Sequence, residues 1–502
     1  MAGMIREWVR GRSSNTLGIA SVLVLSAFIA VALYASKGNV FAVAALLGVG
    51  LVVSVSMYRL EWGLYVFVGL VLVLDQFYIP GLNPITFQLE FFKNLKETSF
   101  FRGAGWGVLN PIEIYLLLLF FVWALLVSIR KRFRFVRIPV WGLCLAFFGW
   151  LVVSFGRGMS TGGEILPALW ELRALFYLVI MYFFVPQIAH GKKQIESLMW
   201  VCILMITFKA LQGAARFVSY GFSFAGFATL TNHEDPVFIT TLIVFVCGLW
   251  LFGAKHRQRT FITVAMVVLV AGFAAGQRRA AYAGLFIGIA ALVALLPRAQ
   301  LMRLSKIALP LAPILILYIV VALNTNTKLG SPVRLLATSF STEEEEAGDR
   351  YYSNLYRENE KYNLAVTLRS SPLMGIGFGK KYQTPIGLAR IPFPLWNYIP
   401  HNEILWLLVK TGGLGFFLFW FFLNSYVFKG AYVLKNVRDP YLRAVGIISL
   451  VAVVNQLVVS YYDLQLTYYR NMIYLGILMA LLPMIERADA ESALERRTED
   501  KP

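Results

Sequence analysis

A histidine and an asparagine stand directly before a long apolar segment near the end of the chain. His401 and Asn402 open the sequence HNEILWLLVKTGGLG, which also contains Gly412 and Gly415. A histidine can accept a proton at neutral pH, and the Asn402 amide can orient a hydroxyl group. In a regular helix of about 100° per residue, both glycines lie within roughly 40° of His401. We therefore expect a base on a helix face that a second helix can approach closely.

Two adjacent arginines form a second candidate group. Arg278 and Arg279 lie in a tight turn between two apolar segments, and residues 260–296 contain no other charged side chain. Charges close to a bilayer are costly and usually functional. Paired guanidinium groups bind phosphate bidentately. The pair therefore indicates a phosphate or diphosphate site, with a lipid-headgroup anchor as the alternative.

The composition places these residues in a membrane protein. The chain is 58% hydrophobic and only 15% charged, whereas soluble proteins have about 25% charged residues. About fourteen apolar segments are long enough to cross a bilayer. We predict an all-α polytopic membrane protein with about 12–14 transmembrane helices and one large outside loop that contains an amphipathic helix. The segments centre on residues 17–35, 40–57, 63–79, 111–129, 138–156, 166–187, 195–213, 235–253, 260–276, 280–296, 307–323, 403–428, 444–460 and 467–485.

The basic residues follow the predicted topology. The net charge is +19, and the arginines and lysines gather in alternate loops when the N-terminus is placed inside the cell. This pattern explains the charge without a nucleic-acid partner. Arg278 and Arg279 then lie outside, against the rule. The cysteines, Cys144, Cys202 and Cys247, fall within predicted spans and lack metal-type spacing.

The predicted spans divide the chain into four parts. Residues 1–323 hold the first eleven spans, and residues 324–402 form the large outside loop. Residues 403–485 hold the last three spans, and residues 486–502 form a charged cytoplasmic tail. Residues 80–110 form another long outside segment, but only the outside loop is large enough to form a small extramembrane subdomain.

The outside loop begins with a polar stretch and continues with a predicted helix. STEEEEAGD is typical of a solvated segment. Apolar residues from Tyr351 to Val366 then recur at helical spacing, with Arg350 and Arg357 on another face. The helix should end before Pro372. The following GIGFGKK lacks the Ser or Thr of a Walker loop, so we expect its glycines to permit a tight backbone.

Other polar residues allow two interpretations each. His233, in TNHEDP at the start of a predicted span, is either a polar cap or an active-site residue. Arg173 and Glu171 lie close together within a predicted span and can form a structural ion pair. Asp75 is a further candidate for a buried partner.

Several of these motifs together resemble the O-antigen ligase and polymerase superfamily. They are HN followed after nine residues by GGLG, the arginine pair in QRRAAYAG, and a large outside loop with Arg357 before PLMGIGFG. The resemblance covers roughly residues 260–428. It implies an inverting, metal-independent glycosyltransferase without a cofactor. Such an enzyme moves a glycan from undecaprenyl diphosphate at the periplasmic face of the bacterial inner membrane, in contact with membrane lipids.

The resemblance also implies roles for single residues. His401, with Asn402, corresponds to the base or acceptor-orienting group. Arg278 or Arg279 corresponds to one diphosphate ligand and Arg357 to another. The family has a further arginine shortly before the span that starts near residue 235. Arg216 is the nearest candidate here, and TNHEDP departs from the family pattern at that place.

Several functions remain compatible with the sequence. A ligase transfers the glycan to a lipid, a polymerase transfers it to another repeat unit, and an O-oligosaccharyltransferase transfers it to a protein hydroxyl. A polysaccharide or lipid transporter also needs many spans, but we find no internal repeat of the kind common in transporters. A structural subunit of an export assembly would give the arginine pair no purpose.

Overall fold

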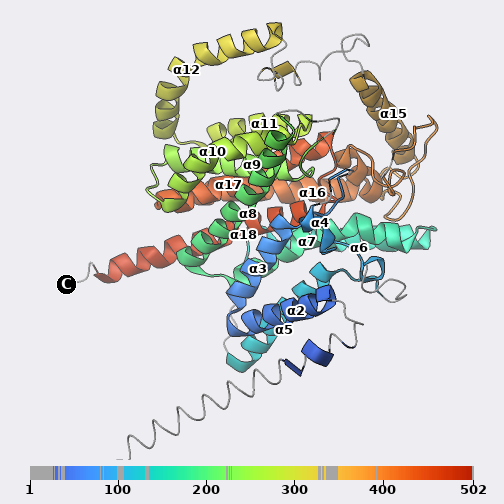
Figure 1. The fold of residues 1–502 in the computed structure, drawn as a ribbon, viewed down its shortest axis with the longest axis horizontal. Coiled ribbons are helices and arrows are strands. Elements are labelled where there is room, and N and C mark those ends of the chain that lie inside the picture. Colours follow the sequence, from blue (N-terminus) through green and yellow to red (C-terminus); the bar gives the residue numbers. More distant parts are fainter. Residues whose placement is uncertain are drawn as a thin grey trace, which may run out of the picture. The chain divides into compact units, whose positions relative to one another are not determined.

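Helices make up the described part of the chain in this computed structural model (Figure 1). The structure describes residues 40–79, 81–82, 84–98, 107–130, 135–221, 229–325, 349–391 and 393–499, with a few single residues outside these ranges. It is 77% helical, and the described residues contain no strand. The predicted all-α class is therefore confirmed.

The chain forms two compact units. The first combines Met1–Val66 with Lys93–Lys131, and the second combines Phe67–Phe92 with Arg132–Pro502. In the first unit α2 packs on α5. Its helices are α2 (Val40–Tyr58), η1 (Leu95–Glu97), α5 (Pro111–Arg130) and the first part of α3 (Leu60–Val73).

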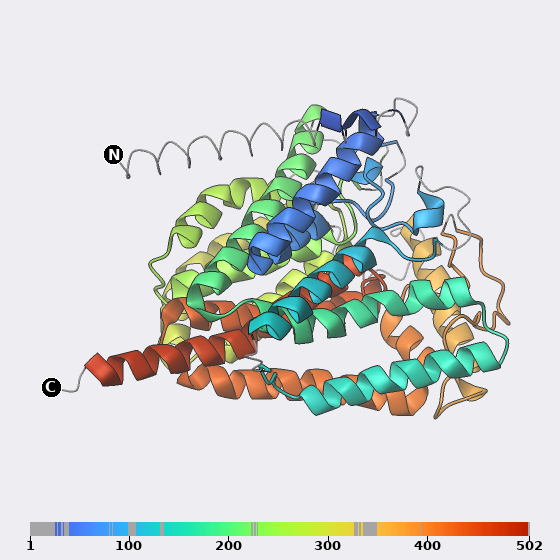
Figure 2. The same cartoon turned by 90° about the horizontal axis from the view of Figure 1, so that it is seen from below.

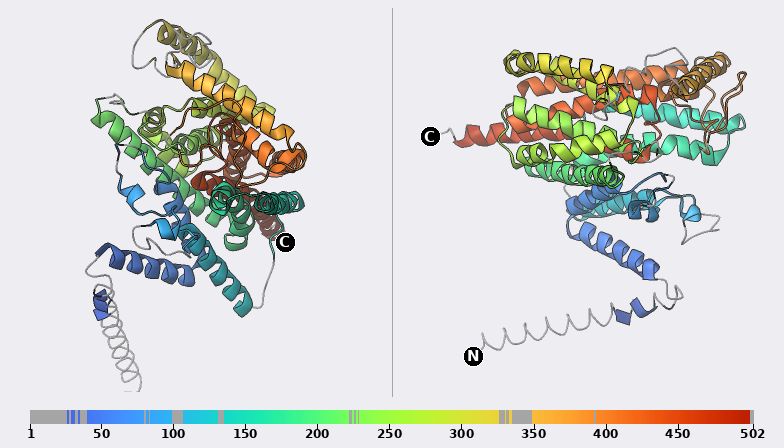
Figure 3. Two further views of the ribbon diagram at one scale, coloured as in Figure 1. Left: turned by 90° about the vertical axis from the view of Figure 1, so that its right-hand side faces the viewer. Right: turned by 45° about the horizontal axis from the view of Figure 1, so that its top comes forward.

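The second unit is a helical bundle that contains all the residues of the candidate site. α18 packs on α7, α10 packs on α8, and both α11 and α16 pack on α17. Figure 2 shows α6 and α16 side by side, and Figure 3 shows the bundle from two further directions. Its helices are α4 (Ile85–Gln88), α6 (Trp141–Ser160), α7 (Ile165–Ile188), α8 (Gly191–Ser219), α9 (Asp235–Leu251), α10 (Arg257–Ala275), α11 (Arg279–Leu295), α12 (Arg298–Asn324), α15 (Asp349–Arg369), α16 (Glu403–Asn436), α17 (Pro440–Tyr462) and α18 (Tyr469–Glu499).

The helices have the lengths and composition of a multi-pass membrane protein. In the described residues, eight helices are long and apolar enough to cross a membrane, and α12, bent by 51°, would make a ninth. Each predicted span from residue 40 onward overlaps a helix, but the helix in the predicted span 63–79 ends at Val73. The predicted span 17–35 and the polar STEEEEAGD stretch lie mostly outside the described residues. Four shorter apolar helices are Leu47–Tyr58, Leu60–Val73, Asp235–Leu251 and Arg279–Leu295.

The helix predicted in the outside loop is present as α15. It ends at Arg369, before Pro372, as the sequence predicts. The next segment, residues 372–379, does not return directly to α16. It packs against a break in that helix, which is the main departure from the sequence-based expectation.

α16 is broken at Gly412, whose φ of 68° and ψ of −177° are non-helical. The amide of Ile376 donates to the carbonyl of Val409 over 2.9 Å, in the turn before the break. A Cβ atom on Gly412 would lie 2.2 Å from the carbonyl oxygen of Leu373. Glycine is thus required both by the conformation and by the close approach of residues 372–379.

The two glycines predicted to admit a helix have different neighbours. At Gly415, a Cβ atom would lie 2.4 Å from the indole of Trp150 on α6, and this indole donates to the Thr411 carbonyl over 2.9 Å. Gly412 is instead approached by loop backbone. Since α16 begins after His401 and breaks at Gly412, the regular face assumed to join the histidine to both glycines is not formed.

A buried ion pair stabilises the broken region of α16. Lys410 Nζ lies 2.6 Å from Glu171 Oε1 on α7. Glu171 also accepts from the Gly379 amide over 2.6 Å and from the Trp406 indole over 3.2 Å. The sequence offered Arg173 as the partner of Glu171, whereas the structure pairs this carboxylate with Lys410.

Candidate functional site

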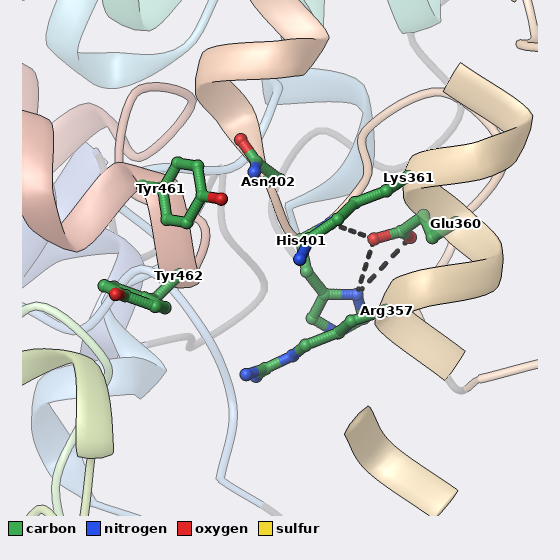
Figure 4. A pocket seen from close by; sticks show the side chains of 7 residues that line it. All are labelled: Arg357, Glu360, Lys361, His401, Asn402, Tyr461 and Tyr462. Atoms are coloured by element: carbon green, nitrogen blue, oxygen red, sulfur yellow. Dashed lines mark hydrogen bonds and ion pairs between the residues drawn. The ribbon is translucent and has the colours of Figure 1, made fainter. Parts of the chain in front are cut away.

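A pocket lies between the middle of α15, the start of α16 and the end of α17 (Figure 4). α15 forms one wall, the residues just before α16 form the floor, and the C-terminal end of α17 forms the opposite wall. The pocket brings two of the predicted site regions together, the loop helix and the histidine motif. Its lining residues are Arg357, Glu360, Lys361, His401, Asn402, Tyr461 and Tyr462.

His401 is held by a buried carboxylate on α15. Glu360 accepts the His401 backbone amide over 2.8 Å, and its two oxygens lie 3.4 and 3.3 Å from His401 Nδ1. Figure 4 shows these contacts as dashed lines. A carboxylate at Nδ1 favours the tautomer with its proton there, which leaves Nε2 free to accept one. A histidine held in this way is able to serve as a general base.

Glu360 is a site residue that the sequence analysis did not identify. It is only 2% exposed, and the hydroxyl of Tyr382 lies 3.4 Å from its other face. In sequence Glu360 belongs to a charged stretch that reads as a solvated helix face. The one available signal was its position a single helical turn after Arg357.

Asn402 caps α16 and presents an unused donor to the pocket. Its Oδ1 accepts the amide of Leu405 over 3.0 Å, a standard N-cap contact. The side chain is buried, with 4% exposed, and its Nδ2 has no hydrogen-bond partner among the described residues. Buried donors are normally satisfied, so a substrate oxygen is a fitting partner for this amide.

Arg278 belongs to a second cluster, formed with His233 and Asp463. Arg278 Nη1 lies 3.8 Å from Asp463 Oδ2, and His233 Nδ1 lies 3.5 Å from the same oxygen. Arg278 Nη2 also contacts His233 Nε2. Arg278 directly precedes α11, His233 lies just before α9, and Asp463 directly follows α17. His233 thus lies beside the predicted phosphate-binding arginine. A simple polar cap would not require this contact.

The cluster and the pocket share one electrostatic environment. Burial alone would raise the pKa of Asp463, but the hydrogen bond and charge of His233 and the charges of Arg278 and Arg357 hold it well below its ordinary value. Burial and then the charge of Arg278 lower the pKa of His233, and His401 adds to this effect. Arg357, which lines the pocket, therefore also acts on Asp463 of the cluster through its charge.

The arginine pair is divided between two positions. Arg278 is the N-cap residue of α11 and lies in the cluster, and Arg279 is the first residue of the helix. Arg216 lies elsewhere, near the end of α8, and its Nη1 donates to the Leu230 carbonyl over 2.8 Å. Leu230 is three residues before His233, so Arg216 supports the segment that carries this histidine.

A buried polar network supports the start of α9 behind this cluster. Asp75 pairs with Lys209 over 2.6 Å, and Lys209 Nζ also lies 3.7 Å from Asp235. Arg470 of α18 donates to Asp235 over 2.9 Å. The sequence left the role of Asp75 open, and the structure makes it a partner of Lys209. These ion pairs fix the helix end from which His233 projects.

Comparison with known proteins matches part of the chain to one family. The family model described as O-antigen ligase matches residues 264–420. This range includes Arg278, Arg357, Glu360 and His401, while His233 and Asp463 lie outside it. A search of curated proteins found no match. The match over residues 264–420 supports an assignment to the O-antigen ligase and polymerase superfamily.

Proposed function

We propose that the protein transfers a glycan from undecaprenyl diphosphate to an acceptor hydroxyl at the periplasmic face of the bacterial inner membrane. Membership of the superfamily supports ligase- or polymerase-type glycan transfer by a membrane enzyme. The observation that carries the finer proposal is the His401–Glu360 pair, which opens into a pocket shared with Arg357. A base beside phosphate-binding cations is the arrangement that this reaction needs.

The proposed reaction exchanges one bond to the anomeric carbon for another. His401 Nε2 accepts the proton of the acceptor hydroxyl, and the hydroxyl oxygen attacks the anomeric carbon from the face opposite the diphosphate. The bond from that carbon to the diphosphate oxygen breaks, and undecaprenyl diphosphate leaves with the electron pair. The configuration is inverted, and His401 later releases its proton to water.

The arginines would stabilise the leaving group. Negative charge develops on the diphosphate as its bond to the sugar breaks. Arg278 lies 3.8 Å from the carboxylate of Asp463, and Arg357, which lines the pocket, lowers the pKa of the same carboxylate through its charge. The guanidinium groups thus supply the charge stabilisation that a metal provides in other transferases. The proposal therefore includes neither a metal nor a cofactor.

The same pocket chemistry serves a ligase or a polymerase. A polymerase would use a second lipid-linked repeat as acceptor and leave His401 and the arginines in the same roles. A transporter is a weaker candidate, because a buried carboxylate that orients a histidine has a direct use in proton transfer and none in passive binding. The products formed in cells distinguish these functions.

The test replaces His401 and Arg278 by alanine in a strain that lacks the chromosomal gene. We expect each change to reduce glycan transfer by roughly 100-fold or more, with the protein inserted in normal amounts. His256→Asn and Arg257→Ala, at the start of α10, are matched controls and should retain transfer.

The accumulated material identifies the reaction. Long glycans that remain on the lipid carrier indicate a ligase, and products with a single repeat indicate a polymerase. Unchanged surface glycan in both the His401→Ala and Arg278→Ala strains would falsify the proposed site.

A further inference from the structure

Two consecutive tyrosines form the pocket wall that the proposed reaction does not yet use. Tyr461 and Tyr462 are the last residues of α17, and they are 44% and 45% exposed. Their ring centroids lie 5.0 Å apart with the planes nearly perpendicular, at 85°. Figure 4 shows both rings across the pocket from α15, with His401 between the two walls. Large apolar surface is thus left open beside the proposed base.

The pocket is chemically different at its two sides. Arg357 acts on Asp463 together with Arg278 and so belongs to the phosphate side. One helical turn further along α15, Lys361 places its ammonium 6.0 Å from the centroid of the Tyr461 ring. Diphosphate fits the arginine side, because that side carries the fixed positive charge. The side formed by Tyr461 and Tyr462 offers exposed aromatic surface, which suits a second substrate group that is largely uncharged.

A pyranose ring has the properties that match this aromatic side. One face of a sugar carries C–H groups that pack against aromatic rings, while its hydroxyls need donors and acceptors at the edge. The unpartnered Asn402 Nδ2 and the Lys361 ammonium provide donors beside Tyr461. The pocket measures about 50 Å³, enough for a few water-sized groups and too small for a whole pyranose ring. A hydroxyl can therefore enter it, while the ring that bears the hydroxyl rests on the tyrosines at its mouth.

We propose that Tyr461 and Tyr462 form an acceptor subsite that stacks a pyranose ring. The acceptor hydroxyl then belongs to a sugar and not to a serine or threonine side chain. This inference rests on the proposed function, because it assigns the acceptor side of the same reaction. It competes with one simpler explanation, in which the tyrosines only anchor the end of α17 in the membrane interface.

Binding of simple sugars to the full-length protein in lipid nanodiscs tests the subsite without any donor. The probes are methyl α-D-glucopyranoside, methyl α-D-mannopyranoside and methyl β-D-galactopyranoside, with N-acetylserinamide as the non-sugar hydroxyl. Saturation-transfer NMR gives the dissociation constant for each. The variants are the pair Tyr461→Ala with Tyr462→Ala, the pair Tyr461→Phe with Tyr462→Phe, and Tyr432→Ala as an exposed tyrosine at the other end of α16.

We expect at least one glycoside to bind in preference to the serine derivative. The double alanine variant should bind it roughly 10-fold more weakly, whereas the phenylalanine pair and Tyr432→Ala should bind within about twofold of the wild type. Absence of glycoside binding to the wild type, or equal binding by the double alanine variant, overturns the proposal. So does a loss of folded protein in the alanine variant while the recovered protein binds sugar normally, because that outcome identifies an interfacial anchor.

The result is separable from the proposed function. His401→Ala should leave glycoside binding intact, since the histidine acts on the hydroxyl proton and not on the sugar face. If that variant still transfers glycan in cells, the proposed reaction fails, but the measured sugar binding and its dependence on the tyrosines remain.

Discussion

Replacing Glu360 by glutamine is the most direct test of how His401 is oriented. The carboxylate accepts the His401 backbone amide over 2.8 Å and lies 3.3 to 3.4 Å from Nδ1. Glutamine keeps the size of the side chain but removes the charge. Its amide group can also donate to Nδ1, which favours the tautomer with the proton on Nε2, and that tautomer cannot accept the acceptor proton.

The expected magnitude follows from the length of the contact. Hydrogen bonds that involve a charged group contribute about 1.5–3 kcal/mol, and strong ones span about 2.7–2.9 Å. The Nδ1 contact is longer than this range, so we take the lower end, about 1.5 kcal/mol. A loss of that size in the transition state alone lowers kcat by roughly 10-fold. The effect should be clearly smaller than that of removing His401 itself.

The assay measures initial rates of the purified protein in nanodiscs with a lipid diphosphate-linked glycan as donor. Glu360→Gln should lower kcat while leaving the donor KM within about twofold, because Glu360 does not contact the diphosphate side. Glu491→Gln is the control, since this carboxylate lies on α18, outside the lining of the pocket, with 51% of its side chain exposed. An unchanged kcat in Glu360→Gln, in protein whose His401→Ala variant is inactive, would show that the carboxylate does not orient the base.

Two further predictions concern the parts of the structure that hold the site. Asp463→Asn should lower the pKa of His233 further below its ordinary value of 6.5, because the hydrogen bond and charge of Asp463 raise this pKa. NMR titration of the four labelled histidines measures the pKa of His233. An unchanged or higher value in the variant would contradict the prediction. The pKa of His233 is lower in the folded protein than in the unfolded chain. The stability that the neutral histidine contributes above pH 6.5 is therefore lost on acidification, and more of it is lost in the variant. Gly412→Ala should destabilise the protein by about 3 kcal/mol or more, whereas Gly413→Ala, whose Cβ would meet nothing closer than 3.4 Å, should not; equal melting temperatures would contradict the required conformation.

The helices could be predicted because their signals are local. An apolar run of sufficient length specifies a helix without reference to the rest of the chain. The helical spacing of its apolar residues likewise predicts α15. His401 was found for a similar reason, since a polar pair directly before an apolar run marks a helix start. The family match over residues 264–420 covers this same region.

The partners of these residues could not be predicted because they are distant in sequence. Glu360 is 41 positions from His401, and nothing in its neighbourhood separates a buried carboxylate from a solvated one. Asp463 follows the next span, and the charged residues that lower its pKa come from three other parts of the chain. Pairing of this kind is decided by how the helices pack, which one sequence does not specify.

The break in α16 shows a different limit. GGLG was interpreted as small residues in a continuous helix, which glycine permits, but glycine also permits the left-handed backbone that the structure adopts. The choice depends on residues 372–379, whose carbonyls and amides satisfy the groups freed at Gly412. We expect the glycines of GIGFG to permit a tight backbone. Gly375 lies against the broken helix, whereas Gly377 and Gly379 lie against the neighbouring ends of α6 and α7.

Glu403 explains how the two sides of the site keep their relative position. This buried carboxylate, the first residue of α16, accepts the amides of Gln465, Leu466 and Thr467. His401 lies two residues before it, and Asp463 lies two residues before the segment it binds. The Glu403 carboxylate therefore joins the segment that carries His401 to the segment that carries Asp463. A shift of α16 against α17 would move His401 away from Arg278 and Asp463, so the proposed chemistry depends on this connection as much as on the reacting side chains.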